Sequence, residues 1–180
     1  MVSWVLTYTG KQFDVKRPRL RDIDIRDIAH HLSLVCRFTG ACAFHYSVAQ
    51  HSLLVASQVP QELKLEALLH DASEAYLADV SRPVKKLEEL RSYRDLDRRV
   101  QQAVFRRFGV RSLEEPHMAL TNAVRTADNA ALVTEGLALL PYMKGWNTLG
   151  KPLKVRIAQR TPADVEQEFL ATWEELHHAR

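Results

Sequence analysis

The pattern that most restricts the fold is the helical spacing of apolar residues from Asp24 onward. Asp24 is a residue type that caps helices, and after it apolar side chains recur three and four positions apart between Ile25 and Cys36. Several similar segments follow. Because a helix with one apolar stripe must bury that stripe against a neighbour, the sequence predicts an all-α fold, a compact bundle of helices.

Capping and breaking residues divide this pattern into successive helices. Ser47 and Gln50 form a capping box, which places His51 in the first turn of its helix. The other boundaries also come from local signals. The first helix ends near 37–38, the second ends at Pro60, and a third spans 63–76 before a loop at 79–83. A fourth helix starts at Ser92 with Asp95 and ends before Gly109, a fifth spans 114–140, and the last starts at 161–164.

Short strands are predicted outside the helices. The β-prone segments 4–9 and 12–15 flank Gly10 and predict a small N-terminal hairpin before Pro18. Residues 155–157 predict another short strand. The 180 residues contain no internal repeat or low-complexity run, and this length suits one domain with a sizeable core. We expect residues 1–180 to form a single domain.

Composition restricts the partners and the location. Lys and Arg exceed Asp and Glu by 25 − 22 = +3, a mild basic excess that suits small anionic substrates, and no Lys/Arg block predicts binding of a nucleic acid polymer. We find no leader, no apolar run of membrane-spanning length, and no disulfide framework around Cys36 and Cys42. We expect a cytoplasmic protein without a membrane partner. Since compact helical domains often pair through helix faces, we also expect a homo-oligomer.

Two histidines and two aspartates on the predicted helices suggest a metal site: His51, the adjacent pair His70-Asp71, and Asp128. Adjacent side chains on a helix diverge by about 100°. His70 and Asp71 can therefore share an ion only where other helices complete its coordination. This mixture of nitrogen and oxygen suits Mn²⁺, Fe²⁺, Co²⁺, Ni²⁺ or Zn²⁺, whereas Ca²⁺ and Mg²⁺ prefer oxygen alone and structural zinc usually recruits cysteine. We expect a divalent transition metal.

The same residues carry a resemblance to a known superfamily. His51, the run from Leu68 to Glu74 with its His-Asp pair, and Asp128 together resemble the signature of the HD-domain metal-dependent phosphohydrolases. Within that superfamily, the stretch from Glu66 to Lys85 is similar to the compact bacterial 5′-deoxynucleotidases and the phage-type deoxynucleoside triphosphohydrolases. The likeness covers residues 22–140. It implies a compact helical HD-domain bundle.

The resemblance implies specific roles around the metal. His51, His70, Asp71 and Asp128 would hold the ion, which would bind a phosphate oxygen and lower the pKa of a coordinated water. Asp71 would thus take part in catalysis. Glu74 lies one helical turn beyond His70 and would act on this water as general base or proton relay.

The resemblance also implies a nucleotide pocket. Arg37 matches the phosphate-binding arginine of the nucleotidases, and Asp79 matches the residue that hydrogen-bonds the sugar 3′-hydroxyl. Phe38 would lie against the base or sugar, and Lys85 would be a further cation for a longer phosphate chain. The nucleotidase pattern has tryptophan at the position of Phe38, so the base pocket differs in shape.

Three functions remain open from the sequence. The first is hydrolysis of a deoxynucleoside 5′-monophosphate to nucleoside and phosphate, which the match over 66–85 favours. The second is release of triphosphate from a dNTP, which extra cations such as Arg82 and Lys85 would favour. The third is a non-catalytic nucleotide-binding module. A binuclear phosphodiesterase site takes additional histidines, but only His117 lies between Asp71 and Asp128, so we expect one ion per site.

Overall fold

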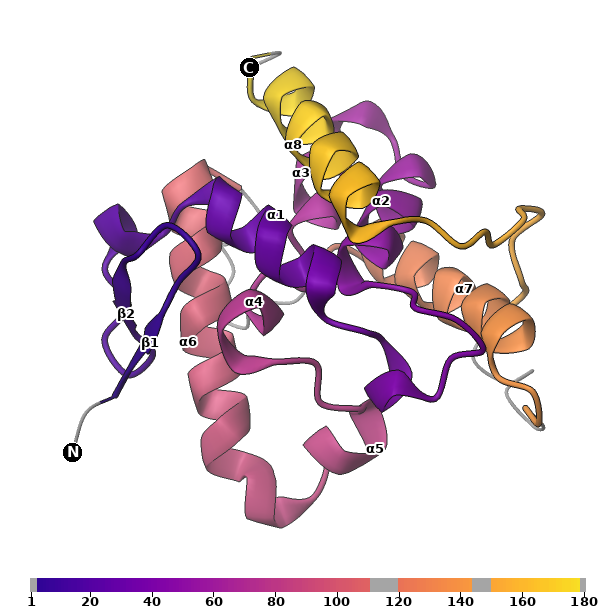
Figure 1. The fold of residues 1–180 in the computed structure, drawn as a ribbon, viewed down its shortest axis with the longest axis horizontal. Helices are drawn as coiled ribbons and strands as arrows, with labels where there is room; N and C mark the ends of the chain where they lie inside the picture. The colour runs from indigo at the N-terminus through magenta and orange to yellow at the C-terminus, as the bar shows by residue number, and fades with distance from the viewer. Residues whose placement is uncertain (1–2, 111–119, 144–149, 179–180) are drawn as a thin grey trace.

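The computed structural model describes residues 3–110, 120–143 and 150–178 and folds them mainly into helices (Figure 1). A hairpin of two strands, β1 Trp4–Leu6 and β2 Gln12–Asp14, opens the chain. The α-helices are α1 Ile25–Leu34, α2 Val48–Ser57, α3 Lys64–Leu68, α4 Glu74–Leu77, α5 Arg82–Lys85, α6 Arg91–Phe108, α7 Asn122–Leu139 and α8 Pro162–His178. Short 3-10 turns lie at Leu20–Asp22, Phe38–Gly40, Gln61–Leu63 and Glu88–Leu90. The predicted all-α class and N-terminal hairpin are confirmed.

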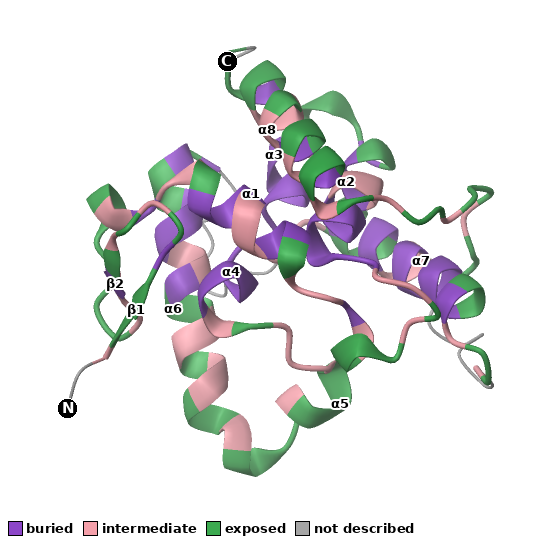
Figure 2. Cartoon of the chain, viewed as in Figure 1, coloured by how far each residue is buried: buried purple, intermediate pink, exposed green. Residues whose placement is uncertain are grey.

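The core forms where α1, α2, α3 and α8 pack together, with α7 against α2. Figure 2 shows the buried surface concentrated on these helices, whereas α5 and the lower part of α6 are largely exposed. Every side chain from Val48 to Ser52 is buried, so the first turn of α2 lies in the interior. Among the described residues, no helix is both long enough and apolar enough to cross a membrane.

The hairpin is antiparallel, and one of its faces joins the core. Val5 pairs with Phe13, and the side chain of Phe13 is fully buried and stacks on Tyr76 at a centroid distance of 3.9 Å. The buried carboxylate of Asp27 in α1 accepts hydrogen bonds from the amide and hydroxyl of Thr9, at 2.7 and 2.9 Å. Aromatic packing and these hydrogen bonds therefore hold the hairpin against α1 and α4.

The first helix begins as predicted but ends earlier. Asp24 caps α1 as expected, yet the helix stops at Leu34 instead of continuing to 37–38. The following residues are extended, and the amide of Arg37 donates to the carbonyl of Tyr46 at 2.9 Å. The prediction was wrong because this pairing with the segment before α2 replaces helical hydrogen bonds.

Only half of the predicted capping box forms at the start of α2. The hydroxyl of Ser47 accepts from the amide of Gln50 at 3.1 Å, which confirms the cap and the place of His51. The side chain of Gln50 instead donates to the carbonyl of Ala158 at 2.8 Å. This bond ties the segment before α8 to α2. The strand predicted at 155–157 is wrong, because the described structure gives these residues no strand partner.

The predicted third helix is broken at the His-Asp pair. The amide of Glu74 donates to the carbonyl of Asp71, only three residues back, at 3.0 Å. In the gap between α3 and α4, the side chain of Gln101 donates to the carbonyl of Leu69 at 2.7 Å and accepts from the amide of Ser73 at 2.9 Å. A continuous helix was the wrong prediction because a side chain from α6 satisfies the backbone groups that the helix would have paired.

Three other predicted boundaries change as well. The loop predicted at 79–83 gives way to α5 from Arg82. Helix α6 starts at Arg91 with Leu90 in the cap position, because the preceding 3-10 turn leads directly into it, so Ser92 is already helical. Helix α7 starts at Asn122 instead of near 114, because Thr121 caps it. His117 and the rest of 111–119 lie outside the described residues.

Two predicted helix boundaries are confirmed, the end of α6 and the start of α8. Gly109 ends α6 with a left-handed backbone, φ 66°. The hydroxyl of Thr161 accepts from the amide of Asp164 at 3.2 Å, as expected for the cap of α8.

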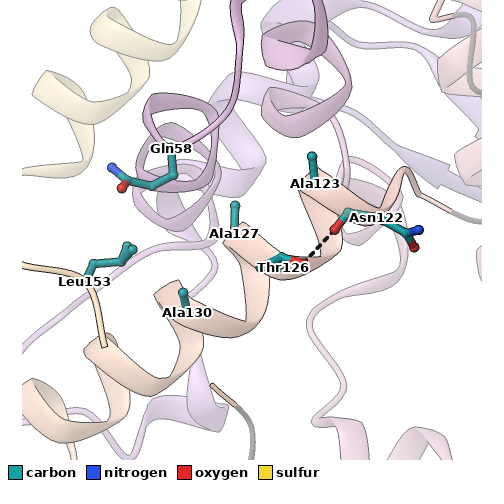
Figure 3. Close-up of a pocket in the computed structure, with 7 residues that line it drawn as sticks. All are labelled: Gln58, Asn122, Ala123, Thr126, Ala127, Ala130 and Leu153. Atoms are coloured by element: carbon teal, nitrogen blue, oxygen red, sulfur yellow. Dashed lines mark hydrogen bonds between the residues drawn. The ribbon is translucent and has the colours of Figure 1, made fainter. Parts of the chain in front are cut away.

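A shallow pocket of about 400 Å³ lies between α7, the end of α2 and the segment before α8 (Figure 3). The residues that line it are Gln58, Asn122, Ala123, Thr126, Ala127, Ala130 and Leu153. The hydroxyl of Thr126 is directed to the carbonyl of Asn122, at 2.8 Å, within α7. None of these lining residues is an acid, a base or a thiol, so the pocket supplies no group for metal or acid–base chemistry.

Ala78 adopts a backbone conformation that usually requires glycine. Its φ of 64° and ψ of 161° lie in a region that strains any residue with a Cβ. Its amide donates to the carbonyl of Glu74 at 2.9 Å, and its carbonyl accepts from the hydroxyl of Tyr93 at 3.1 Å. These bonds on both sides hold the strained residue in place, directly before Asp79.

Replacing Ala78 with glycine is expected to stabilise the protein by about 1 kcal/mol, because it relieves the strain. Urea unfolding followed by circular dichroism measures this change. The matched control is Ala171→Gly at an exposed position of α8, which should destabilise by about 0.5–1 kcal/mol. Equal destabilisation by both substitutions would show that Ala78 is not strained.

Candidate metal centre

His51 is a buried histidine with one ring nitrogen unpaired. Its exposed fraction is 0%, and its Nδ1 lies 2.8 Å from Oε1 of Glu135 on α7. Because an ionised carboxylate only accepts hydrogen bonds, Nδ1 carries the hydrogen and the Nε2 of the neutral ring carries a lone pair. Nε2 is buried without a hydrogen-bond partner. This is how a protein orients a histidine ligand toward a metal.

His70 is oriented in the same way by the backbone. Its Nδ1 lies 2.7 Å from the carbonyl of Ala67, so Nδ1 donates to the backbone and Nε2 is left for another partner. This Nε2 is also buried without a hydrogen-bond partner. Burial opposes protonation, but the carboxylates of Asp71 and Asp128 raise the pKa of His70 to about 9. The site therefore favours positive charge.

Asp71 brings a carboxylate oxygen to both free nitrogens. Its Oδ2 lies 3.2 Å from Nε2 of His70 and 3.8 Å from Nε2 of His51. One ligand atom from each of the three residues lies within 4.8 Å of the others. With metal–ligand bonds of about 2.0–2.2 Å, atoms at these separations can share one ion. His51, His70 and Asp71 thus form a group close enough to hold a metal ion.

Asp128, the fourth predicted ligand, lies beside this group. Its Oδ1 is 3.3 Å from Nε2 of His51 and 4.0 Å from Nε2 of His70. Burial opposes ionisation, but the neighbouring imidazoles of His51 and His70 lower the pKa of Asp128 to about 2. Its Oδ2 accepts from the guanidinium of Arg82. One oxygen therefore faces the metal group, and the other faces an arginine.

Glu74 is a buried carboxyl group close to Asp71. Burial and the charge of Asp71 raise its pKa well above the usual range. Its Oε1 accepts from Nζ of Lys85 at 2.8 Å, whereas its Oε2 is buried without a hydrogen-bond partner. Lys85 also lies 3.8 Å from Asp97. The structure thus places Lys85 against Glu74 and Asp97.

Arg37 lies in the interior between two carboxylates. Its exposed fraction is 7%, and its guanidinium is 3.1 Å from Oε2 of Glu135 and 3.9 Å from Oδ2 of Asp71. These charges raise the pKa of Arg37, although burial opposes them. The guanidinium lies 5.3 Å from the ring centre of half-buried Phe38. Phe38 has a left-handed backbone, φ 54°, which costs energy in a residue with a Cβ.

Asp79 completes the predicted set. It is half-buried, and burial raises its pKa against the opposing charge of Arg37. Asp71 and His51 are also close enough to influence this pKa. The predicted residues around the metal group therefore lie near one another, and their assigned roles stay predictions.

Glu135 is the residue that the sequence analysis missed. It is fully buried, and its Oε1 accepts from the hydroxyl of Tyr46 at 3.0 Å as well as from His51. Burial opposes its ionisation, but the neighbouring His51 and Arg37 lower its pKa. A usable signal existed: Glu135 stands seven residues after Asp128, two helical turns along the same face, and is the only charged residue between Ala130 and Leu139.

Comparison with known proteins places the chain in a bacterial family. No protein-family model matches it. The chain is 37% identical over 134 residues to YfdR of Escherichia coli, a match covering 74% of this chain and 71% of YfdR. It is 35% identical over 186 aligned positions to RCAP_rcc00048 of Rhodobacter capsulatus, covering 94% and 93% of the two chains. Both relatives are described as uncharacterized proteins. The chain belongs to the same family as these two proteins.

Proposed function

We propose that this protein is a metal-dependent phosphohydrolase of the HD-domain superfamily. The observation that supports this most directly is the pair of buried, unpaired Nε2 atoms of His51 and His70, which face the carboxylates of Asp71 and Asp128. Unpaired polar atoms are costly to bury, and a bound cation removes that cost. The substrate that we propose is a deoxynucleoside 5′-monophosphate, hydrolysed to nucleoside and phosphate.

The donor set supports a transition metal. Two imidazole nitrogens and two carboxylates suit Mn²⁺, Fe²⁺, Co²⁺, Ni²⁺ or Zn²⁺ better than Ca²⁺ or Mg²⁺. We propose one ion, held by His51, His70, Asp71 and Asp128. When bound, the ion supplies a water of lowered pKa and charge for a phosphate oxygen.

Glu74 is suited to move the proton in this reaction. Its Oε2 is unpaired, while Lys85 bonds Oε1 and keeps the carboxyl group in one orientation. Its raised pKa makes it a better base than a free glutamate. In the proposed reaction, water forms a bond to phosphorus, Glu74 takes the proton of that water, and the bond from phosphorus to the 5′-oxygen breaks. Glu74 then returns that proton to the leaving 5′-oxygen, which restores its carboxylate.

A screen of nucleotides against metals tests the proposal. Purified protein is incubated with dNMPs, NMPs and dNTPs and with Mn²⁺, Co²⁺, Ni²⁺, Zn²⁺ or Mg²⁺, and phosphate and triphosphate release are measured separately. We expect phosphate from a dNMP with a transition metal and none after EDTA treatment. Triphosphate from a dNTP would establish the alternative reaction, and nucleotide binding without turnover would indicate a binding module. A folded, metal-loaded protein that neither binds nor hydrolyses nucleotides would contradict the proposal.

Glu135→Gln is expected to weaken Mn²⁺ binding about tenfold, because it removes the negative charge that orients His51 and raises the basicity of its ring. Isothermal titration calorimetry measures the affinity. Tyr46→Phe is the matched control, since it removes only the hydroxyl that bonds the same oxygen of Glu135. If the two variants bind Mn²⁺ equally, the charge of Glu135 does not support the metal site.

A further inference from the structure

Arg82 is an exposed arginine that reaches the metal group from α5. Its side chain is 48% exposed. One guanidinium nitrogen donates to Oδ2 of Asp128, and the other donates to Oδ1 of Asn129 at 2.7 Å. Arg82 therefore bonds a proposed metal ligand directly and remains open to solvent.

The two other cations near the group are differently placed. Arg37 is buried and pairs with Glu135, and Lys85 pairs with Glu74 at 2.8 Å. Neither Glu135 nor Glu74 is a proposed metal ligand, so both pairs can persist when a metal binds. Arg37 also lies 3.9 Å from the proposed ligand Asp71, but it keeps its closer partner Glu135. Arg82 differs because the carboxylate to which it donates is itself one that the metal would use.

A divalent ion on Asp128 would change the electrostatic balance at Arg82. The single negative charge of Asp128 would then face two positive charges from the ion and one from the guanidinium. The ion and the guanidinium repel each other. A phosphate group placed between the ion and Arg82 would relieve that repulsion. It could also accept two parallel hydrogen bonds from the planar guanidinium.

We infer that Arg82 binds the substrate phosphate. Without substrate, its guanidinium covers Asp128; with substrate, it pairs with the phosphate dianion on the metal. The inference rests on the proposed function and names the residue that binds the phosphate of its substrate.

Calorimetry with inorganic phosphate tests this role without turnover. The full chain is titrated first with Mn²⁺, and the loaded protein is then titrated with phosphate. Arg82→Ala should weaken phosphate binding roughly 10- to 100-fold, the usual effect of losing hydrogen bonds to a charged group. It should keep the Mn²⁺ affinity or tighten it, because a competitor for Asp128 is gone. Arg82→Lys should be intermediate, because lysine supplies the charge without the planar pair of donors.

Arg91→Ala is the matched control. It removes the same charge from a side chain that is 77% exposed on α6, and it should bind phosphate as the wild type does. Phosphate affinity of Arg82→Ala within twofold of the wild type, with Mn²⁺ binding retained, would overturn the inference and leave the metal site standing. Failure of the folded wild-type protein to bind Mn²⁺ would overturn the proposed function together with the inference.

Discussion

Asp71→Ala is expected to lower Mn²⁺ affinity by at least about 100-fold, more than the loss of a residue that only supports a ligand. The substitution removes the oxygen that lies 3.2 and 3.8 Å from the two free histidine nitrogens. It also removes a negative charge, since the histidines and Arg37 hold the pKa of Asp71 well below its usual range despite burial. Metal content and calorimetry measure the loss.

The fold should survive this substitution. The side chain of Asp71 is 27% exposed, so its loss removes little core packing, and circular dichroism should show unchanged helix. Asp95→Ala is the matched control, because it removes the same charge from an exposed position of α6 and should leave Mn²⁺ binding unchanged. Wild-type affinity in Asp71→Ala would remove Asp71 from the ligand set.

Glu74→Ala is expected to keep Mn²⁺ affinity within about threefold and to lower kcat by about 10²- to 10⁴-fold, the range for loss of a general acid or base. The reason is that Glu74 has a buried, unpaired oxygen and a pKa that Asp71 influences, but is not one of the ligand residues. Turnover is measured on the substrate found in the screen, and metal content is measured on the same sample.

A loss of turnover in Glu74→Ala must be separated from damage to the fold, because Lys85 loses a buried partner. Glu74→Gln is the appropriate control. It preserves the volume and leaves an amide oxygen for Lys85, so it should fold and bind Mn²⁺ normally while turnover stays low. A Glu74→Gln variant with full kcat would show that Glu74 transfers no proton.

The helices that the sequence located correctly are those whose ends depend on neighbours along the chain. Asp24, Ser47 and Thr161 bond amides two or three residues onward, and Gly109 supplies a left-handed backbone. These effects act within one helical turn, so short-range signals suffice to predict them. The candidate metal ligands came from a different signal, the residue types at His51, His70-Asp71 and Asp128.

The wrong boundaries arise where a distant residue competes for the backbone. The side chain of Gln101 replaces backbone hydrogen bonds of the predicted helix beside His70-Asp71. The side chain of Gln50 donates to the carbonyl of Ala158 and therefore does not complete the capping box. Pairing with Tyr46 ends α1 early. None of these partners lies within a helical turn of the residue that it affects, so periodicity could not predict them.

The sequence by itself determined which segments are helical, where several of them begin, and which side chains could bind a metal. Only the tertiary structure decided that Nε2 of His51 and of His70 have no hydrogen-bond partner. Their tautomers depend on Glu135, 84 residues from His51, and on the carbonyl of Ala67 beside a helix break that a side chain of α6 stabilises. The tertiary structure also decided the contact between Arg82 and Asp128, which lie 46 residues apart in the sequence. Helix formation depends on interactions within one turn, whereas a binding site depends on the packing that brings distant turns together.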